Sequence, residues 1–464
     1  LRGIAVISAV LFHCQIEFIS GGFLGVDIFF VISGFLITSI ITRDLKNNTF
    51  SILQFYQRRV RRIISPLLAV LSVSTIIAWF VLLPRDMVSF LKSSISATFF
   101  YSNYFFLSQS GYFDTVSELK PLLHTWSLAI EEQFYILYPI VLIFLWKYAH
   151  KLTFYILFTI AIASLSLAEI RISDYPSSTY YLLPTRLWEL LAGGLVAMLS
   201  SSNKTSNSHS KLNSLLSYIG FFGVIFSIYY FDNTSPLPGL YTLIPVLSTL
   251  LIVHFVSNTS WLYQLLSHSV LTRAGLISYS LYLWHYPVFS FAKYYTNSTL
   301  SPIVIIFLIF LMVTLSFLTW KFIETPARDY QTISNKKIFV PIVFCIASLI
   351  LVSSMGVYND GYKAIRFEPE QIRKIDSLEE RYVANCIVED CFNSDVRNLD
   401  FVIIGDSTAN QLSGLLSEIS KENKLSLFNF SLVACLPFTE YTIEKKWPVF
   451  SLGCKSNNIN SEKF

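Results

Sequence analysis

Two ionisable residues, Arg2 and His13, lie in the otherwise apolar opening stretch LRGIAVISAVLFHC. Their spacing corresponds to about three helical turns, so one helix would place both on the same face, roughly 16 Å apart along its axis. Polar groups are costly in lipid and usually face a protein interior or a wet cavity. An imidazole there would be uncharged at neutral pH, with a nitrogen free to accept a proton or attack an acyl carbon. We therefore predict that His13 is a reactive base and that Arg2 binds or positions an anionic group. In the simpler alternative, Arg2 lies at the inner interface and His13 bonds to a neighbouring helix.

A cluster of arginines precedes another apolar run in the stretch FYQRRVRRII. Its members are Arg58, Arg59, Arg61 and Arg62. Planar guanidinium groups are well suited to binding phosphates. Basic residues at the end of a membrane span also mark its cytosolic side, which is the alternative reading of the cluster. If the cluster binds a ligand, we expect a phosphate-rich cofactor that arrives from the cytosol.

Two adjacent carboxylates, Glu131 and Glu132, occur early in the apolar segment HTWSLAIEEQFYILYP, after His124. Successive residues of a helix point about 100° apart, so the two side chains must have different partners. Isolated carboxylates are costly in a membrane span. We expect one of them to orient a substrate or a helper group, and structural pairing with arginines is the alternative.

Two further polar residues lie in apolar segments. Asp27 in GGFLGVDIFFVISGFLIT is either an outer-interface residue or a partner of His13, and the glycines of this segment permit close helix packing. His285 lies beside aromatic residues in SYSLYLWHYPVF, a composition typical of an interfacial belt.

The composition indicates a polytopic membrane protein, because hydrophobic residues make up 53% of the 464 residues and charged residues only 14%. Soluble domains carry about 25% charged residues. An all-α membrane bundle of about 10–11 transmembrane helices is therefore predicted. The predicted spans are 3–20, 23–42, 63–83, 127–146, 152–170, 186–200, 213–230, 240–256, 274–293, 301–320 and 338–357.

The orientation of the bundle follows from its Lys and Arg residues, which are concentrated in the loops on the side where the first span begins. Cytosolic loops carry such an excess, so the N-terminal end is predicted to lie inside, and eleven spans place the C-terminal region outside. Residues 90–107 are interrupted by Ser, Asn and Lys. They favour a re-entrant or interfacial helix over a regular span.

The tail after about residue 358 is more hydrophilic than the predicted membrane bundle. Residues 359–398 are charged and are predicted to form an extracytoplasmic linker with short helices. NLDFVIIGDSTANQL then predicts a buried strand, a tight turn and a helix start, which opens an α/β domain over residues 399–464. This region is too short for a complete doubly wound domain. Because the chain also begins without methionine inside a helix, we expect residues missing at both ends.

Four of the six cysteines lie in this tail, at Cys386, Cys391, Cys435 and Cys454. An even number outside the cytosol indicates disulfides. The simplest pairing joins neighbours in the sequence, and the two other pairings remain open. A zinc site is the alternative, although the tail has neither a Cys-x-x-Cys motif nor a histidine.

Taken together, these motifs resemble the bacterial acyltransferase-3 family of membrane acyltransferases. The resemblance covers residues 1–330 and rests on LRGIAV…FH, GGFLGVDIFFVISGFLIT, FYQRRVRRI, HTWSLAIEEQFYILYP, SYSLYLWHYPV and IETPAR. Residues 331–358 would add one further transmembrane helix. The family's Arg-x10-His motif matches Arg2 and His13. Its Arg-x-x-Arg motif matches either Arg58–Arg61 or Arg59–Arg62.

The tail resembles the SGNH-hydrolase domain that is fused to many members of that family. Ser407 in the Gly-Asp-Ser turn matches the nucleophile of that domain, and Thr408 stands where many fused members have a histidine. The Asp-x-x-His that supplies the base is expected beyond Phe464. The printed tail has no histidine and cannot form a Ser-His pair by itself, so we expect no esterase activity from it.

The resemblance implies an O-acetyltransferase of the bacterial inner membrane, with its C-terminal domain in the periplasm. Acetyl-CoA would be the acyl donor, with no metal, and the acceptor would be an extracytoplasmic polysaccharide or lipid-linked glycan such as lipopolysaccharide O-antigen. Peptidoglycan is an alternative acceptor. Membrane lipid is an expected partner and nucleic acid is not. An exporter of an acylated glycan precursor is a rival function that predicts inverted repeats, and none is seen; a membrane-anchored esterase is a second rival.

Overall fold

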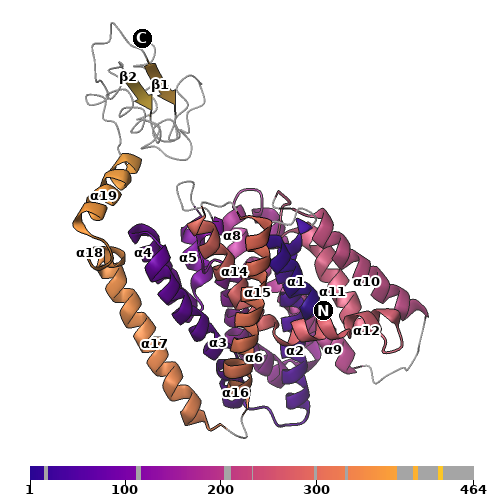
Figure 1. Ribbon diagram of the computed structural model, residues 1–464. Helices are drawn as coiled ribbons and strands as arrows, with labels where there is room; N and C mark the ends of the chain where they lie inside the picture. Colours follow the sequence, from indigo (N-terminus) through magenta and orange to yellow (C-terminus); the bar gives the residue numbers. More distant parts are fainter. Residues whose placement is uncertain are drawn as a thin grey trace. The chain divides into compact units, whose positions relative to one another are not determined.

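Apolar helices dominate the computed structural model (Figure 1), which describes residues 1–14, 19–110, 117–202, 211–232, 234–296, 300–329, 333–383, 401–405 and 427–431. The chain divides into two units, Leu1–Tyr362 and Lys363–Phe464, which are described separately below.

The first unit consists of helices joined by short connections. Its α-helices are α1 (Arg2–His13), α2 (Gly25–Lys46), α3 (Ile52–Val81), α4 (Pro84–Thr98), α5 (Ser102–Ser108), α6 (Thr125–Tyr148), α7 (Thr153–Arg171), α8 (Pro176–Tyr181), α9 (Leu183–Ser202), α10 (Lys211–Tyr230), α11 (Leu243–Phe255), α12 (Trp261–Leu266), α13 (Ser269–Leu276), α14 (Ser278–Tyr295), α15 (Pro302–Thr319), α16 (Thr325–Arg328) and α17 (Asn335–Tyr358).

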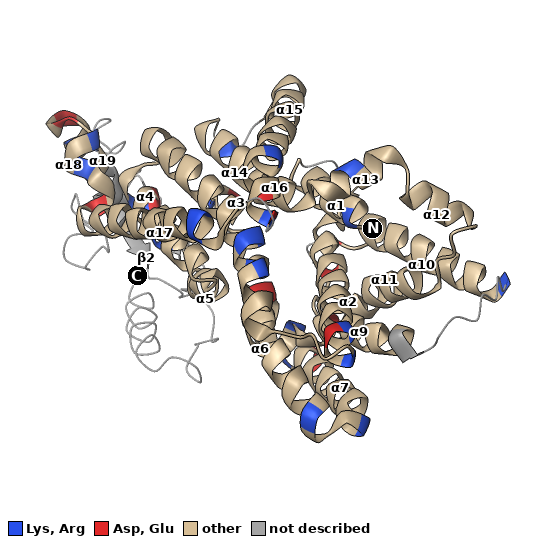
Figure 2. Cartoon of the chain, turned by 90° about the horizontal axis from the view of Figure 1, so that it is seen from below, with Lys and Arg blue, Asp and Glu red and all other residues tan. Residues whose placement is uncertain are grey.

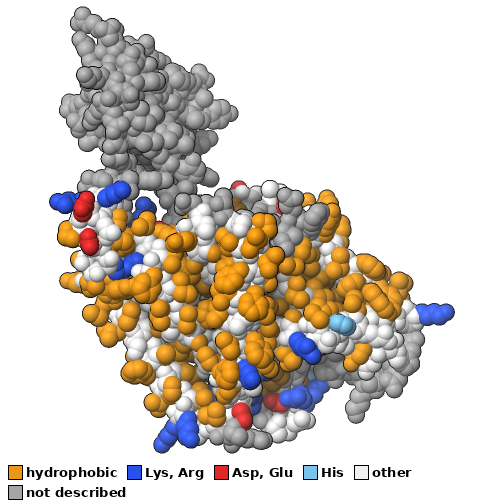
Figure 3. Space-filling view, in the orientation of Figure 1, with side chains coloured by type: hydrophobic (Ala, Val, Ile, Leu, Met, Phe, Trp, Pro, Cys, Tyr) orange, Lys and Arg blue, Asp and Glu red, His pale blue; other side chains and the backbone are white. Residues whose placement is uncertain are grey.

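Within the described residues, eight helices are long and apolar enough to cross a membrane, namely α2, α3, α6, α7, α9, α10, α15 and α17. Large apolar side chains point outward from several of them, for example Phe80, Ile303 and Phe344. Such side chains cover most of the visible surface of this unit (Figure 3). An apolar exterior of this extent is suited to lipid rather than water, so the protein is a multi-pass membrane protein.

Three of the eleven predicted spans differ from the prediction. The spans predicted at 3–20 and 240–256 correspond to shorter apolar helices, Arg2–His13 and Leu240–Phe255. The span predicted at 274–293 corresponds to α14, which has 18 residues but carries Ser, His, Lys and several Tyr side chains among its apolar ones. Within a bundle, neighbouring helices can satisfy polar groups that lipid cannot.

Residues 84–108 form two helices instead of one span. The chain breaks between α4 and α5 at Phe100, which adopts a φ of 53° that non-glycine residues rarely take. Neither helix is among the candidate spans. This agrees with the prediction that residues 90–107 do not form a regular span.

One face of the first unit carries many of its positive charges (Figure 2). Lys and Arg residues lie in the last turns of α2 and α6 and directly before α7, for example Arg43, Lys147 and Lys151. This face contains the loops that the sequence predicts to be cytosolic.

The second unit begins with α18 (Lys363–Arg366) and α19 (Pro369–Val383), which lie in the predicted linker. The predicted strand is confirmed as β1 (Phe401–Gly405), and it pairs in parallel with β2 (Leu427–Ser431), with Phe401 opposite Leu427. Parallel neighbours require a crossover connection, as in α/β domains. The connection, which includes Ser407, lies outside the described residues, as do the four tail cysteines.

Close helix packing in the bundle depends on glycine, as GGFLGVDIFFVISGFLIT predicts. A Cβ atom added to Gly34 of α2 would lie 1.8 Å from the Leu190 carbonyl oxygen of α9, and one added to Gly193 would lie 2.0 Å from the Val31 carbonyl oxygen. Both distances are far below van der Waals contact with backbone atoms, which cannot rotate away. The two helices can therefore approach this closely only while both positions are glycine.

We expect Gly34→Ala to lower the stability of the protein by about 1–3 kcal/mol, because α2 and α9 must move apart. Thermal unfolding in detergent measures the effect. Gly275→Ala is the matched control, since its Cβ would meet no atom nearer than 3.5 Å. An equal melting temperature for the Gly34 variant and the wild type would contradict this role.

Candidate active site

The first helix connects two cavities. Arg2 at the start of α1 lines one cavity, and His13 at its end lines the other. We call them the arginine cavity and the histidine cavity. The two residues thus occupy separate sites, although the sequence predicts correctly that both belong to one helix.

The arginine cavity lies among α1, α2, α3, α6 and α14. Its polar lining residues are Arg2, Ser33, Arg59, Arg62, Ser127, Glu131, Glu132, Tyr135, Ser278, Tyr279 and Tyr282. Ser51 caps the start of α3 by accepting a hydrogen bond from the Gln54 amide (3.4 Å). Arg59 and Arg62 follow about two and three turns later, three residues apart and on one face of the helix.

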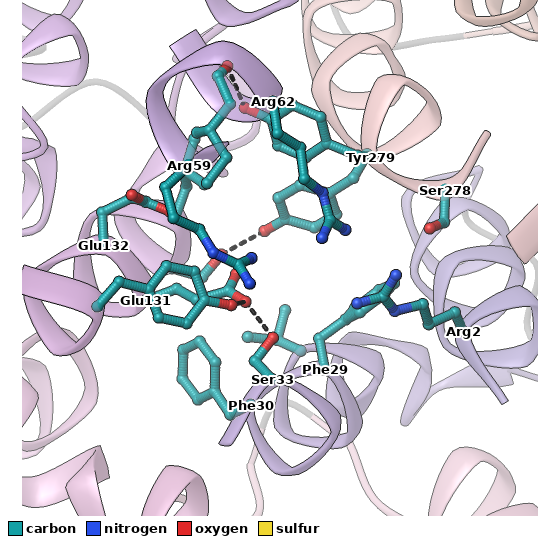
Figure 4. Close-up of a pocket in the computed structure, with 16 residues that line it drawn as sticks. Arg2, Phe29, Phe30, Ser33, Arg59, Arg62, Glu131, Glu132, Ser278 and Tyr279 are labelled. Atoms are coloured by element: carbon teal, nitrogen blue, oxygen red, sulfur yellow. Dashed lines mark hydrogen bonds between the residues drawn. The ribbon is translucent and has the colours of Figure 1, made fainter. Parts of the chain in front are cut away.

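Three guanidinium groups, those of Arg2, Arg59 and Arg62, point into this cavity (Figure 4). Within the part of the chain that the structure describes, none of them makes a hydrogen bond or an ion pair. Arg59 lies over the rings of Phe55 (5.4 Å) and Tyr135 (5.2 Å). Cations that face one another in a poorly solvated space repel, so this arrangement favours an anionic ligand.

The two predicted carboxylates have different surroundings. Glu131 accepts hydrogen bonds from the hydroxyl groups of Ser33 and Tyr135. Glu132 is buried, and its Oε1 atom has no hydrogen-bond partner among the residues described. Both line the arginine cavity, where they balance part of its positive charge. Among the described residues, neither forms the ion pair that the structural alternative requires.

The other two predicted arginines lie outside the cavity. Arg61 is 1% exposed and donates hydrogen bonds to Asn335 Oδ1 (3.0 Å) and to the carbonyl oxygens of Ala327, Asp329 and Ile333 (2.7–2.9 Å). Arg58 lies 4.0 Å from Asp44, and its side chain is 42% exposed. Helical geometry explains the difference, because positions 58 and 61 are rotated about 100° from positions 59 and 62. Arg61 therefore joins α3 to the segment before α17 instead of facing a ligand.

The histidine cavity is lined by three histidines among the described residues, His13, His124 and His285. The ring centroid of His285 lies 5.4 Å from that of His13 and 5.4 Å from that of His124. Tyr286 also contacts His13, at 4.8 Å between centroids. In the described ranges, no group of His, Cys, Asp and Glu is arranged to hold a metal ion. The cluster is instead a set of imidazoles suited to proton transfer or acyl transfer.

Two residues, Val26 and Tyr282, line both cavities and so form the partition between them. The Tyr282 hydroxyl donates to the His124 carbonyl oxygen (3.0 Å) and shares a 2.6 Å hydrogen bond with the Ser127 hydroxyl. These bonds fix the ring between the arginines and the histidines. An acyl group that moves from one cavity to the other must pass this partition.

Asp27 does not pair with His13. It accepts a hydrogen bond from Arg186 (2.6 Å), which also bonds Glu189 (3.0 Å), and all three side chains are buried. The guanidinium group of Arg186 lies over the rings of Trp126 (5.5 Å) and Tyr180 (4.7 Å), which line the histidine cavity. This charge cluster supports one wall of the cavity. The only sequence signal for it was the presence of charged residues in an apolar segment.

Comparisons with known proteins identify the family to which the chain is related. Residues 1–321 match the acyltransferase-3 family, described as an acyltransferase domain. A protein named as an O-acetyltransferase in Staphylococcus aureus strain COL is 33% identical over 441 residues, which cover 88% of this chain and 72% of the relative. The O-acetyltransferase OatA of S. aureus strain NCTC 8325 / PS 47 is 33% identical over 395 residues, or 81% of this chain and 64% of the relative.

No solved structure matches the chain. The family match covers more than half of the chain and includes both cavities. The chain therefore belongs to the acyltransferase-3 family, and it is a multi-pass membrane enzyme of the O-acetyltransferase class.

Proposed function

We propose that the protein transfers an acetyl group from cytosolic acetyl-CoA across the membrane to hydroxyl groups of a cell-envelope glycan. The observation that carries this proposal is the group of three arginines, Arg2, Arg59 and Arg62, which make no hydrogen bond or ion pair with the described residues and which α1 connects to a cluster of histidines. A phosphate-rich donor would occupy the first cavity, and the acyl group would react in the second.

The arginine cavity is suited to the donor because acetyl-CoA carries several phosphates. Arg2, Arg59 and Arg62 would bind these phosphates, and the Glu131 and Glu132 carboxylates would confine them to the arginine side. The pantetheine arm of coenzyme A separates its phosphates from its thioester. The thioester would therefore reach the Tyr282 partition while the phosphates remain on the arginines.

His13 would act on the acyl group beyond the partition. As a general base it would take the proton of an attacking hydroxyl, and as a nucleophile it would carry the acetyl group itself. Trapping of labelled acetyl on His13 distinguishes the two chemistries. Ser407 would then receive the acetyl group as an ester and pass it to a sugar hydroxyl, a step that rests on the Gly-Asp-Ser motif after β1.

The proposed location is the bacterial cytoplasmic membrane, with the second unit on the extracytoplasmic side. The Lys and Arg residues on one face of the bundle support this orientation, since cytosolic loops carry such an excess. The arginine cavity would then receive its donor from the cytosol. A reporter fused after residue 360 tests the orientation, and cytosolic activity of that reporter would contradict it.

We expect His13→Ala to abolish O-acetylation of the glycan while leaving the amount of glycan unchanged, because the variant lacks the reacting imidazole. Mass analysis of the O-antigen and peptidoglycan fractions from complemented deletion cells measures the acetyl content and identifies the acceptor. His150→Ala, an exposed histidine away from both cavities, is the control. Loss of the glycan itself would indicate an exporter, and normal acetylation would refute the proposal.

Removal of one cavity arginine should weaken donor binding specifically. Arg59→Gln or Arg62→Gln is expected to raise the Kd of acetyl-CoA by about 10- to 150-fold, which corresponds to about 1.5–3 kcal/mol for a bond to a charged group. Calorimetric titration of the purified protein in detergent measures the Kd. Arg58→Gln is the matched control on the same helix, because Arg58 lies outside the cavity. An equal loss of affinity in that variant would contradict the assignment of Arg59 and Arg62 as the arginines that bind the donor.

A further inference from the structure

We propose that His285 is a positioning residue for His13, whose ring it holds in the tautomer that reacts with the acyl group. The inference rests on the proposed role of His13 and adds a residue to it. Three observations carry the argument, namely the hydrogen bond of His285, its distance from His13 and the environment of the other groups around His13.

The proton position on His285 follows from its hydrogen bond. The Nδ1 atom lies 2.5 Å from the backbone carbonyl oxygen of Tyr282, one turn earlier in α14. A carbonyl oxygen can only accept, so Nδ1 carries the proton and donates it. The side chain is 1% exposed, and a charged ring would be costly there. The neutral ring therefore has a lone pair on Nε2.

The His13 ring lies at a distance from His285 that allows it to donate a hydrogen bond to the Nε2 lone pair. The two centroids are 5.4 Å apart and the rings are inclined by 42°. Since each ring nitrogen lies about 1.2 Å from its centroid, facing nitrogens would be about 3 Å apart, the length of an N–H···N hydrogen bond. No direct bond joins the two rings in the described structure, but catalytic hydrogen bonds often tighten only when substrate binds.

The neighbouring aromatic groups do not compete for this role. Tyr286 contacts His13 edge to face, but its hydroxyl already donates to the Ser117 carbonyl oxygen (2.9 Å). His124 stacks on the Tyr286 ring at 5.5 Å, and neither of its nitrogens makes a hydrogen bond with the described residues. His285 is thus the group near His13 whose tautomer is set by the backbone.

The resulting arrangement is a relay from a backbone carbonyl through His285 to His13. His13 donates its N–H to His285 Nε2, so its other nitrogen carries the lone pair that faces the acyl group. During transfer the hydroxyl proton of the acceptor moves to this nitrogen, and the hydroxyl oxygen bonds to the acyl carbon. The C–S bond breaks, and the thiol leaves with that proton. His285 changes neither its own bonds nor its protonation.

Two substitutions at position 285 separate this role from a structural one. His285→Asn keeps an amide N–H near the Nδ1 position, so it preserves the bond to Tyr282 but offers no acceptor to His13. His285→Gln places a carbonyl oxygen near the Nε2 position and can still accept from His13. We expect kcat of the Asn variant to fall about 100-fold with the KM for acetyl-CoA unchanged, the size of a general-base effect. The kcat of the Gln variant should lie within about tenfold of the wild-type kcat.

The measurement is release of coenzyme A from acetyl-CoA by the full chain in detergent, with a sugar hydroxyl as acceptor. His254→Asn is the control, because its ring is exposed and bonds only Ser200 (2.9 Å) among the described residues. If the Asn variant does not fold, His285→Ala replaces it, and added imidazole must then restore kcat.

The inference is overturned if the Asn variant keeps the wild-type kcat, or if the Asn variant is more active than the Gln variant. The second result would show that the bond to Tyr282 is the only contribution of His285. The proposed function has its own test, because full activity of His13→Ala would refute it regardless of the results at position 285.

Discussion

The structure depends on one constraint, the cost of leaving a polar group without a partner inside an apolar bundle. Arg186 satisfies this constraint by bonding two carboxylates. Arg61 satisfies it by donating hydrogen bonds to backbone carbonyls and to an asparagine. The guanidinium groups of Arg2, Arg59 and Arg62 make no hydrogen bond or ion pair with the described residues, and all three line one cavity. The same constraint thus distinguishes residues that stabilise the fold from residues that are available to a ligand.

Packing determines how the two cavities are positioned. The glycine contacts between α2 and α9 set the distance between these helices. The Asp27–Arg186 ion pair then joins the same two helices near the histidine cavity. Trp126 and Tyr180, which lie against Arg186, form part of the cavity wall. The shape of the cavity around His13 therefore depends on residues that are not part of its lining, such as Gly34 and Arg186.

Much of this arrangement could be predicted from the sequence. The spacing of Arg2 and His13, the glutamates of α6 and most of the spans follow from local patterns with a period of 3.6 residues. The Arg-x-x-Arg register could not be predicted, because the local pattern does not say which face of α3 meets the bundle. The partner of Asp27 is 159 residues away in the chain, so no local pattern indicates it. The same holds for the His13–His285 contact between α1 and α14.

The partition formed by Val26 and Tyr282 has a consequence for the membrane as a permeability barrier. The two cavities share these side chains as a wall, so little else separates the two spaces at this point. If the two cavities open to opposite sides of the membrane, as the proposed function requires, Val26 and the Tyr282 ring, whose hydroxyl bonds Ser127 and His124, would separate them for protons and small ions. Under the proposed function, the enzyme would have to pass an acyl group through this partition without letting ions follow, so that the ion gradient of the cell is kept.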